Sequence, residues 1–237
     1  MKDFSKRIWL ITKRVLLVLL IGHFVYIIVL KWINPPFTIT QLSSWVRGEG
    51  LKRDYVDFES ISSHARIAVI ASEDQLFPDH NGFDFKSIKK AMDYNEKKPG
   101  RVKGASTISQ QVAKNVFLWQ GRSWFRKGLE VYFTFMIELI WGKRRILEMY
   151  LNVSEMGKGI FGIEASSKHN FGVSAKKLSR IQAAMIAASM PNPRKFTIKP
   201  RSSQVAARYP WVLRQMNNLE KDPDVQAVVS TKPVNKK

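Results

Sequence analysis

A long apolar run lies near the start of the chain. Residues 15–30 read VLLVLLIGHFVYIIVL and carry no formal charge at neutral pH, and apolar residues extend the run back to Ile8 and forward to Ile33. As a helix, residues 8–33 would be about 39 Å long at ~1.5 Å per residue, enough to cross a hydrocarbon core of ~30 Å with some tilt. The pattern predicts a transmembrane anchor over residues 15–33.

Basic residues precede this run, and they predict its orientation. Residues 1–14 contain one acid, Asp3, against five cations: Lys2, Lys6, Arg7, Lys13 and Arg14. Basic flanks stay in the cytoplasm, so the remainder of the chain is expected across the membrane, which in a bacterium is the periplasmic side of the inner membrane. A cleaved signal peptide is the alternative, although no convincing small-x-small cleavage site precedes Pro35-Pro36.

Beyond the anchor, the spacing of apolar positions is mostly helical. It predicts helices over residues 85–94, 106–118, 123–141, 143–152 and 203–219. A capping-box pattern at Ser179–Gln182 starts another helix, which ends at Pro191. With little strand alternation and no internal repeat, the predicted fold class is mainly α.

Four other segments carry weaker patterns. Residues 40–66 favour a short helix and turns, and the apolar run from Arg66 to Asp74 fits a strand or a buried helix. Residues 95–105 contain two glycines, one proline and four Lys/Arg, which predicts a mobile basic loop. Residues 221–237 form a polar tail that we expect to be disordered. The expected catalytic domain therefore spans residues 34–220.

The amino-acid composition limits the kinds of partner that we expect this protein to bind. Of 237 residues, 39 are Lys or Arg and 19 are Asp or Glu, giving a formal charge of +20, of which +15 falls on residues 32–237. Such a surplus favours an anionic partner. Across a membrane from the cytoplasm this indicates anionic lipid or lipid-linked phosphate and disfavours nucleic acid. The chain has no cysteine, which excludes disulfide scaffolds and Cys-ligated metal sites.

Three segments carry candidate chemistry, and the first is residues 73–84, EDQLFPDHNGFD. Its two acids directly follow an apolar run. A carboxylate there can be partly dehydrated, which raises its pKa toward the range useful for a general acid or base. An ordinary helix end with exposed acids is the alternative.

The second segment is residues 106–115, STISQQVAKN. At ~100° per residue its polar side chains share one half of a helix, and Ile108, Val112 and Val116 share the other half. Amides beside one ammonium at a helix N-terminus suit sugar hydroxyls and phosphate. A solvated amphipathic helix is the alternative.

The third segment is residues 122–141. Glu130, Thr134 and Glu138 form a stripe about 80° wide on an otherwise apolar helix, which we expect to be mostly buried. Buried acids need partners, and the nearest candidates by type are Arg126, Lys127 and Lys114. A structural ion pair and a functional site remain equal alternatives.

Together these segments resemble the peptidoglycan glycosyltransferases. The ordered motifs EDxxFxxHxGxD, GxSTxxQQxxKN, RKxxE, ILExYLN and RxxxVLxxM occur at residues 73–84, 104–115, 126–130, 146–152 and 208–216. The departures are small: Ala105 and Ser109 stand where glycine and threonine are common. Because no second catalytic domain follows Met216, the chain resembles the monofunctional members of the family and not the bifunctional penicillin-binding proteins.

The resemblance implies a lysozyme-like glycosyltransferase domain beside the membrane. It would polymerise lipid II into a growing glycan strand and release undecaprenyl diphosphate by an inverting mechanism, with Glu73 as general base and Glu130 as the second catalytic carboxylate, on the diphosphate side. The substrate-binding candidates are Ser106, Gln110, Gln111, Lys114, Asn115, Arg122, Arg126 and Lys127. The residues expected to shape the first motif are Asp74, Phe77, His80 and Asp84.

Other roles follow from the same resemblance. No cofactor is required and no metal ligand is assigned, although a divalent cation, Mg or Mn, at the diphosphate is left open. Cell-wall synthesis or division proteins are candidate partners. Glu148, Asn152 and Arg208 are predicted to be structural, and Pro210 is a candidate start for the last helix.

Two other functions compete with this interpretation. A hydrolase on the same fold would shorten glycan strands, but it would not need the Lys/Arg-rich second and third motifs. A non-enzymatic, anchored basic scaffold for cell-wall or division complexes would not depend on the carboxylate of Glu73.

Overall fold

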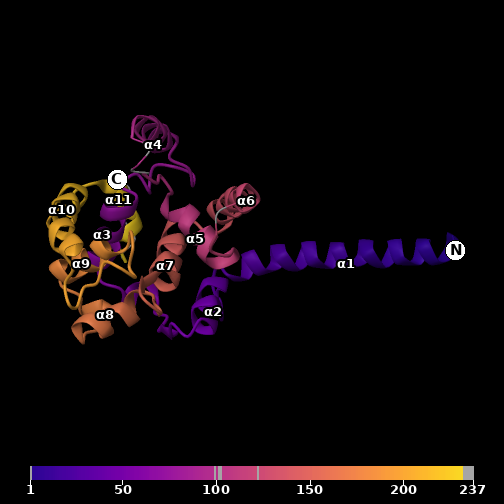
Figure 1. Cartoon of the computed structure of the whole chain (residues 1–237), viewed down its shortest axis with the longest axis horizontal. Helices are drawn as coiled ribbons and strands as arrows, with labels where there is room; N and C mark the ends of the chain where they lie inside the picture. The colour runs from indigo at the N-terminus through magenta and orange to yellow at the C-terminus, as the bar shows by residue number, and fades with distance from the viewer. Residues whose placement is uncertain (1, 99, 101–102, 122, 232–237) are drawn as a thin grey trace. The chain divides into compact units, whose positions relative to one another are not determined.

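The computed structural model describes residues 2–98, 100, 103–121 and 123–231. The chain divides into two compact units, residues 1–35 and 36–237, which are described separately. Figure 1 labels the helices of both.

The first unit is one helix, α1 (Lys2–Val29). Residues 6–29 are long and apolar enough to cross a membrane, which is consistent with single-pass anchoring. The helix starts earlier than the predicted anchor because the basic leader is helical as well. A signal sequence has the same length and composition, so the uncleaved anchor stays a prediction.

The second unit is mainly α, as predicted. Its helices are α2 (Ile39–Val46), α3 (Ser63–Glu73), α4 (Phe85–Lys97), α5 (Ile108–Phe117), α6 (Trp124–Ile140), α7 (Lys143–Val153), α8 (Ile163–Phe171), α9 (Arg180–Ser189), α10 (Ser203–Leu219) and α11 (Pro223–Val229), with 3-10 turns η1 (Phe58–Ser60) and η2 (Ala175–Lys177). A small sheet has the order β1-β3-β2, where β1 is Lys52–Arg53, β2 is Glu155–Gly157 and β3 is Ile160–Phe161. β1 runs parallel to β3, and β2 runs antiparallel to it.

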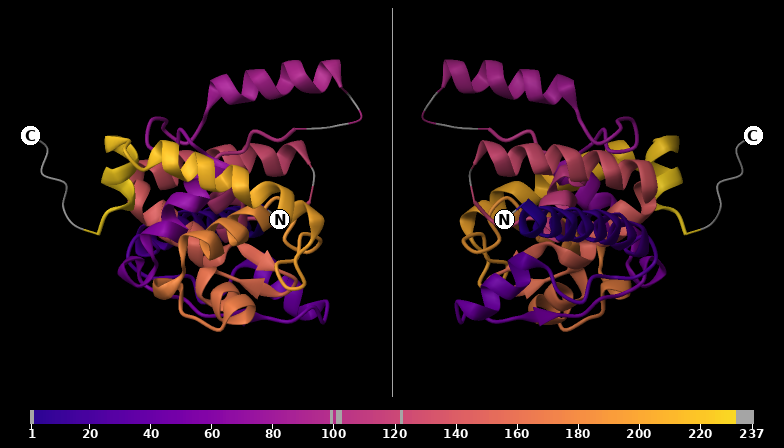
Figure 2. Two further views of the ribbon diagram at one scale, coloured as in Figure 1. Left: turned by 90° about the vertical axis from the view of Figure 1, so that its left-hand side faces the viewer. Right: turned by 90° about the vertical axis from the view of Figure 1, so that its right-hand side faces the viewer.

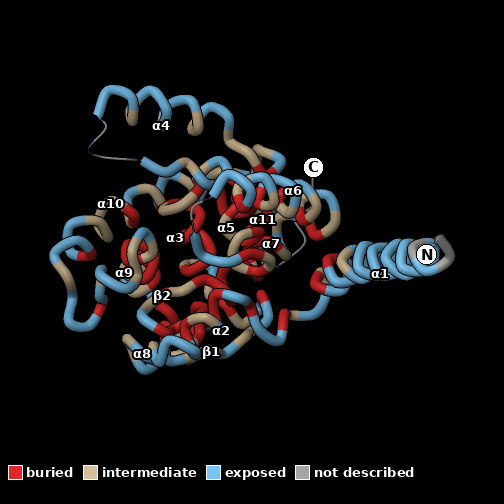
Figure 3. The backbone as a smooth tube through the Cα atoms, turned by 45° about the vertical axis from the view of Figure 1, so that its right-hand side comes forward, coloured by how far each residue is buried: buried red, intermediate tan, exposed pale blue. Residues whose placement is uncertain are grey.

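The core is centred on α3, α5, α7 and α9. Residues 65–71 of α3 are all buried, so this helix is covered on every side, and its pattern alone could not distinguish it from a strand. It packs against α9 and α10, while α5 packs against α6 and α7. Figure 3 shows this buried centre in red. The last residue of α3, Glu73, thereby faces the space between α9 and α10 on one side and α5 and α7 on the other.

Helix α4 has a different environment. None of its residues is buried, and Figure 2 shows it lying apart from the remaining helices of this unit. It extends to Lys97 and so takes in the start of the segment predicted as a loop. Within that segment, the Asn95 side chain exchanges two hydrogen bonds with the backbone of Lys103; residues 99, 101 and 102 lie outside the described residues.

Three expectations about elements were wrong. Helix α6 is not mostly buried: its buried residues are Arg126, Glu130, Thr134 and Ile137, while Trp124, Phe125, Phe135 and Leu139 are exposed. The polar stripe faces the protein because its charges are paired there.

The other two concern the C-terminal part. Pro210 lies inside α10, because Ser202 caps the helix before it and accepts a hydrogen bond from Val205 N. Residues 223–229 form α11 and are not a disordered tail. Asp222 caps α11, and Val225, Val228 and Val229 are buried. Residues 232–237 of the predicted tail lie outside the described residues.

Candidate functional site

A cavity of 1580 Å³ opens between α3, α4, α5 and α10. Its walls include candidate residues from two motifs: Glu73, Asp74, Asp84, Ser106, Gln111, Lys114 and Asn115. Arg208 and Tyr150 line it as well. The motifs are far apart in sequence, and the packing of α3 against α10 and of α5 against α7 brings them to one place.

Glu73 is the last residue of α3, and its carboxylate is held from two sides. Gln111 Nε2 donates to Glu73 Oε2 at 3.2 Å, and Ser72 Oγ lies 3.2 Å from Glu73 Oε1. Burial raises the pKa of Glu73, whereas the hydrogen bond from Gln111, the charge of Arg208 and the hydrogen bond from Ser72 lower it in part. A carboxylate that is partly dehydrated but still hydrogen-bonded suits a general base.

The orientation of Gln111 is set by Tyr150. The Tyr150 hydroxyl donates to Gln111 Oε1 at 3.1 Å, so the amide nitrogen of Gln111 is directed at Glu73. Tyr150 is 1% exposed. The sequence predicts that Gln111 positions substrate but assigns no role to Tyr150. The signal that was available is the tyrosine within the fourth motif.

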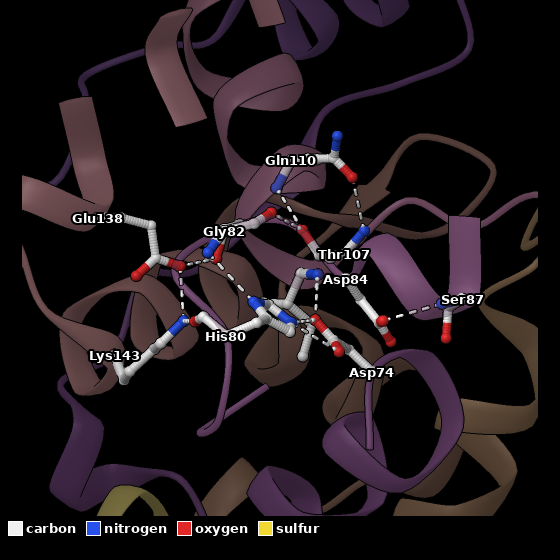
Figure 4. Close-up of polar contacts among 11 residues, drawn as sticks. Asp74, His80, Gly82, Asp84, Ser87, Thr107, Gln110, Glu138 and Lys143 are labelled. Carbon is white, nitrogen blue, oxygen red and sulfur yellow. Dashed lines mark hydrogen bonds and ion pairs between the residues drawn. The ribbon is translucent and has the colours of Figure 1, made fainter. Parts of the chain in front are cut away.

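Asp74, next along the chain, joins two elements. Its carboxylate accepts from Ile108 N at 2.9 Å, at the start of α5, and lies 3.0 Å from His80 Nε2. Gly82 N donates to His80 Nδ1 at 3.1 Å, so the ring proton is on Nε2 and is directed at Asp74. Figure 4 shows these contacts. They fix the end of α3 against the first turn of α5.

The remaining expected shaping residues of the first motif also have defined places. Phe77 is fully buried, with its ring 6.3 Å from that of His80. Asp84 caps α4 by accepting from Ser87 N at 2.9 Å. Burial acts to raise the pKa of Asp84, but the hydrogen bonds from Ser87 outweigh it and the pKa is lowered.

A half-buried ion pair supports the loop that carries His80. Lys143 Nζ lies 2.7 Å from Glu138 Oε1 and also donates to the carbonyl of His80, and Ser109 Oγ donates to Glu138 Oε1. The sequence predicts Glu138 in the stripe on α6, but it does not reveal the roles of Lys143 and Ser109. Lys143 lies three residues before the start of the fourth motif at Ile146 and is therefore not part of the motif pattern.

One predicted substrate-binding residue on α5, Gln110, does not line this cavity but lines a smaller one beside it. Gln111, Lys114 and Asn115 line the cavity. Gln110, by contrast, is 3% exposed and belongs to the capping box of α5: Thr107 N donates to Gln110 Oε1 at 3.0 Å, and Gln110 N donates to Thr107 Oγ1. Thr107 also donates to the carbonyl of Gly82 at 2.7 Å. The helical projection could not show this, because the cap turns the side chain back to the N-terminus.

Lys114 is one of several cations on the cavity wall. It has no ion-pair partner among the described residues, although Glu130, Arg126, Lys127 and Glu73 all act on it at longer range. Burial lowers its pKa, and the charge of Glu130 opposes that effect. A partly dehydrated ammonium without a paired carboxylate is suited to binding an anion.

Glu130, predicted as the second carboxylate, is paired with two cations, and its charge also acts on Lys114. It is 3% exposed and does not line the main cavity. Its Oε2 lies 2.7 Å from Arg126 Nη1, and its Oε1 pairs with Lys127 Nζ. Lys127 lines a smaller neighbouring cavity of 240 Å³ with Ser106 and Lys103. Arg122, the other basic candidate here, lies outside the described residues.

Among the described residues, no cluster of three or more His, Asp or Glu side chains could hold a metal ion. Glu130, the carboxylate expected on the diphosphate side, already has both oxygens in ion pairs. The donor set at this end is cationic, so these residues do not fit a protein-held divalent cation.

Comparison with known proteins agrees with the motif analysis. The family model described as Transglycosylase matches residues 39–217. A biosynthetic peptidoglycan transglycosylase of Pseudomonas putida strain F1 is 50% identical over 212 residues, covering 87% of this chain and 89% of the relative. Its counterpart in Yersinia pseudotuberculosis is 48% identical over 200 residues, covering 81% and 83%. The five motifs, the mainly helical domain and these similarities lead to one conclusion: the chain is an enzyme of the transglycosylase family.

Proposed function

We propose that this peptidoglycan glycosyltransferase polymerises lipid II at the outer face of the bacterial inner membrane and releases undecaprenyl diphosphate. The observation that carries the proposal is the cavity that joins a held carboxylate, Glu73, to the ammonium of Lys114. A base and a cation on the walls of one cavity match a reaction in which a hydroxyl attacks and a diphosphate leaves.

In this proposal Glu73 takes the proton from the attacking sugar hydroxyl. The hydroxyl oxygen forms a bond to the anomeric carbon of the donor on the face opposite the leaving group, the bond from that carbon to the diphosphate oxygen breaks, and the configuration inverts. Burial favours the uncharged carboxyl, so the carboxylate is more basic than an exposed one. Gln111, held by Tyr150, keeps the carboxylate oriented.

Lys114 stabilises the charge that develops on the leaving diphosphate. Ser106 and Asn115 line the same cavity and would position sugar or phosphate oxygens. Glu130 acts indirectly: it holds Arg126 and Lys127 in place and does not itself contact the reacting atoms. In this proposal protein cations stabilise the diphosphate, since the residues present do not fit a metal ion.

Both the substrate and the surface of the enzyme connect the proposed reaction to the membrane. Lipid II is anchored in the bilayer, and α1 has the length and composition of an anchor. In the catalytic unit, α6 exposes an apolar face that includes Trp124, Phe125, Phe135 and Leu139. Contiguous apolar surface of this kind is typical of contact with a membrane or partner, and we assign it to the lipid surface.

The test is polymerisation of labelled lipid II in detergent by the wild type and by Glu73→Gln. We expect polymer from the wild type and a loss of at least about 100-fold in the variant, the scale for removal of a general base. Asp93→Asn on α4 removes one exposed carboxylate and is the matched control. Shortened glycan strands in place of polymer would indicate a hydrolase, and an unaffected Glu73→Gln variant would remove the proposed base.

A further inference from the structure

Arg208 was expected to be only structural, but its contacts lead to the proposed base. It projects from α10 to the C-terminal end of α3, where its Nη2 donates to Ser72 O and to Ser72 Oγ, both at 3.2 Å. Its guanidinium carbon lies 5.1 Å from the centre of the Trp211 ring. Arg208 lines the same cavity as Glu73.

Ser72 continues this connection to Glu73. Its hydroxyl oxygen lies 3.2 Å from Glu73 Oε1 and 3.1 Å from the carbonyl oxygen of Ala187 in α9. A hydroxyl has one proton to donate and two lone pairs to accept with. Because Arg208 donates to this oxygen, the proton of the hydroxyl is directed at either Glu73 or Ala187.

Whether Glu73 is ionised or protonated determines which of these two oxygens accepts the proton of the Ser72 hydroxyl. When Glu73 is ionised, its negative oxygen is the stronger acceptor, and the Ser72 proton is directed at it. When Glu73 is protonated, its own proton can be donated to Ser72 Oγ, and Ser72 then donates to the Ala187 carbonyl. Arg208 donates in both states and keeps its charge, so it favours the ionised one.

We propose that Arg208 is a positioning residue for this enzyme: through Ser72 it orients the carboxylate of Glu73 and favours the ionised form that accepts the proton. The proposal rests on the proposed function, in which Glu73 is the general base. Arg208 itself gives up no proton. The acceptor hydroxyl loses its proton to Glu73 while the sugar-to-diphosphate bond breaks, and Glu73 later releases that proton to solvent.

Other charged and titratable groups also act on Glu73. Asp74 follows it in the chain, Lys114 acts from α5 and Tyr150 from α7. The neighbouring α9 contributes the carbonyl of Ala187. Arg208 lowers the pKa of Glu73 against the larger, opposite effect of burial. Arg208 is also the cation with a hydrogen-bonded route to the carboxylate, through Ser72.

The experiment is the pH profile of kcat/KM for lipid II polymerisation by the full chain. In Arg208→Gln we expect the acidic limb to move to higher pH, because the carboxylate loses a nearby cation. At pH values below the limb, kcat/KM of Arg208→Gln should be at least about 10-fold lower than that of the wild type. At pH values above the limb, it should lie within about 3-fold of wild type. Ser72→Ala should move the limb in the same direction, and Arg208→Lys should move it less than Arg208→Gln.

Arg214→Gln is the matched control, since Arg214 is exposed on the same helix and its loss changes the net charge equally. Its profile should overlay that of the wild type. A loss in Arg208→Gln by one factor at every pH, with an unmoved limb, would overturn the proposal in favour of a structural role. If Arg208→Gln does not fold, an unmoved limb in Ser72→Ala overturns it.

Glu73→Gln separates this proposal from the proposed function. If that variant polymerises lipid II like the wild type, Glu73 is not the base and both proposals fail. If it is inactive while the limb stays unmoved in Arg208→Gln and Ser72→Ala, the general base stands and only the role of Arg208 fails.

Discussion

At the scale of single residues, the site is built from side chains that fix one another. Tyr150 sets the amide of Gln111, Gln111 and Ser72 hold Glu73, and His80 holds Asp74. The bonds join residues that are close in sequence as well as residues from different helices. Asn152 acts in the same way outside the site: fully buried, it exchanges hydrogen bonds with both backbone groups of Val56, in agreement with its expected structural role.

The raised pKa of Glu73 predicts a stability effect with a definite sign. Burial raises the pKa of this carboxyl in the folded state. Between its unfolded and folded pKa values the native state therefore binds more protons than the unfolded state, so this group lowers stability as pH rises through that window. Relative to wild type, Glu73→Gln should therefore gain stability as pH rises through the window and show no further change outside it.

Thermal unfolding of both proteins in the same detergent across that pH range measures the difference. Asp93→Asn, which removes an exposed carboxylate on α4, should show no such trend. A Tm difference between Glu73→Gln and wild type that does not change with pH would contradict the prediction.

Gly82 predicts a steric effect. Its φ is +88°, and a Cβ there would lie 2.7 Å from Thr134 Cγ2 and 3.0 Å from Glu138 Cγ. Gly82→Ala must therefore strain the backbone and push the loop that carries His80 away from α6, at a cost of about 1–3 kcal/mol. Gly104→Ala, where a Cβ meets no atom within 4 Å, is the control. Chemical denaturation should show a clearly lower free energy of unfolding for Gly82→Ala and almost no change for Gly104→Ala.

At the scale of elements, α6 shows why an apolar pattern did not predict burial. The charges of its polar stripe are paired within the protein: Glu130 with Arg126 and Lys127 of the same helix, and Glu138 with Lys143 of α7. The apolar flanks are left at the surface. The spacing of apolar residues identifies two faces of a helix but not which face is covered, and only the packing of α5 against α6 decided that.

The exposed face of α6 predicts contact with lipid. The chain has no cysteine, so a single cysteine can carry an environment-sensitive fluorophore. In Leu139→Cys the label should shift to the blue when the full chain is reconstituted in vesicles, because Leu139 is 70% exposed on this face. Lys177→Cys, on the exposed polar end of η2, should stay water-like. Equal spectra from the two labels would contradict a lipid-facing α6.

At the scale of the whole molecule, charge is the dominant property. The +15 on residues 32–237 lies in a unit whose main cavity includes Lys90, Lys103 and Lys114 on its walls. A surplus of this kind attracts an anionic lipid surface and a diphosphate-bearing substrate, and salt weakens that attraction.

The predicted consequence is a KM for lipid II that rises with ionic strength. As salt increases from about 0.01 to 0.15 M the Debye length falls from about 30 to about 8 Å, and attraction between the basic unit and its anionic substrate is screened. The measurement is KM in vesicles of neutral and of anionic lipid at both salt concentrations. The rise should occur in both, because the substrate itself carries the diphosphate. A salt-independent KM would show that the net charge does not contribute to substrate binding.

The sequence by itself determined the family, the helical class and most helix positions. Local signals carry these: five motifs in order, the capping box at Ser179, and apolar spacing that matched α10 from Ser203 to Leu219. The resemblance of the first motif also predicted Glu73 as the general base, whereas an acid at the end of an apolar run left an ordinary helix end as the alternative.

Tertiary structure decided what depends on distance between segments. It placed Tyr150 and Arg208 near Glu73 and made Gln110 part of the capping box of α5. It also buried Glu130 outside the main cavity and packed α11 against the domain through three buried valines. A sequence pattern reports the faces of one element, whereas a hydrogen bond between α10 and α3 depends on how two elements pack. Packing is set by the whole core, and no local pattern contains it.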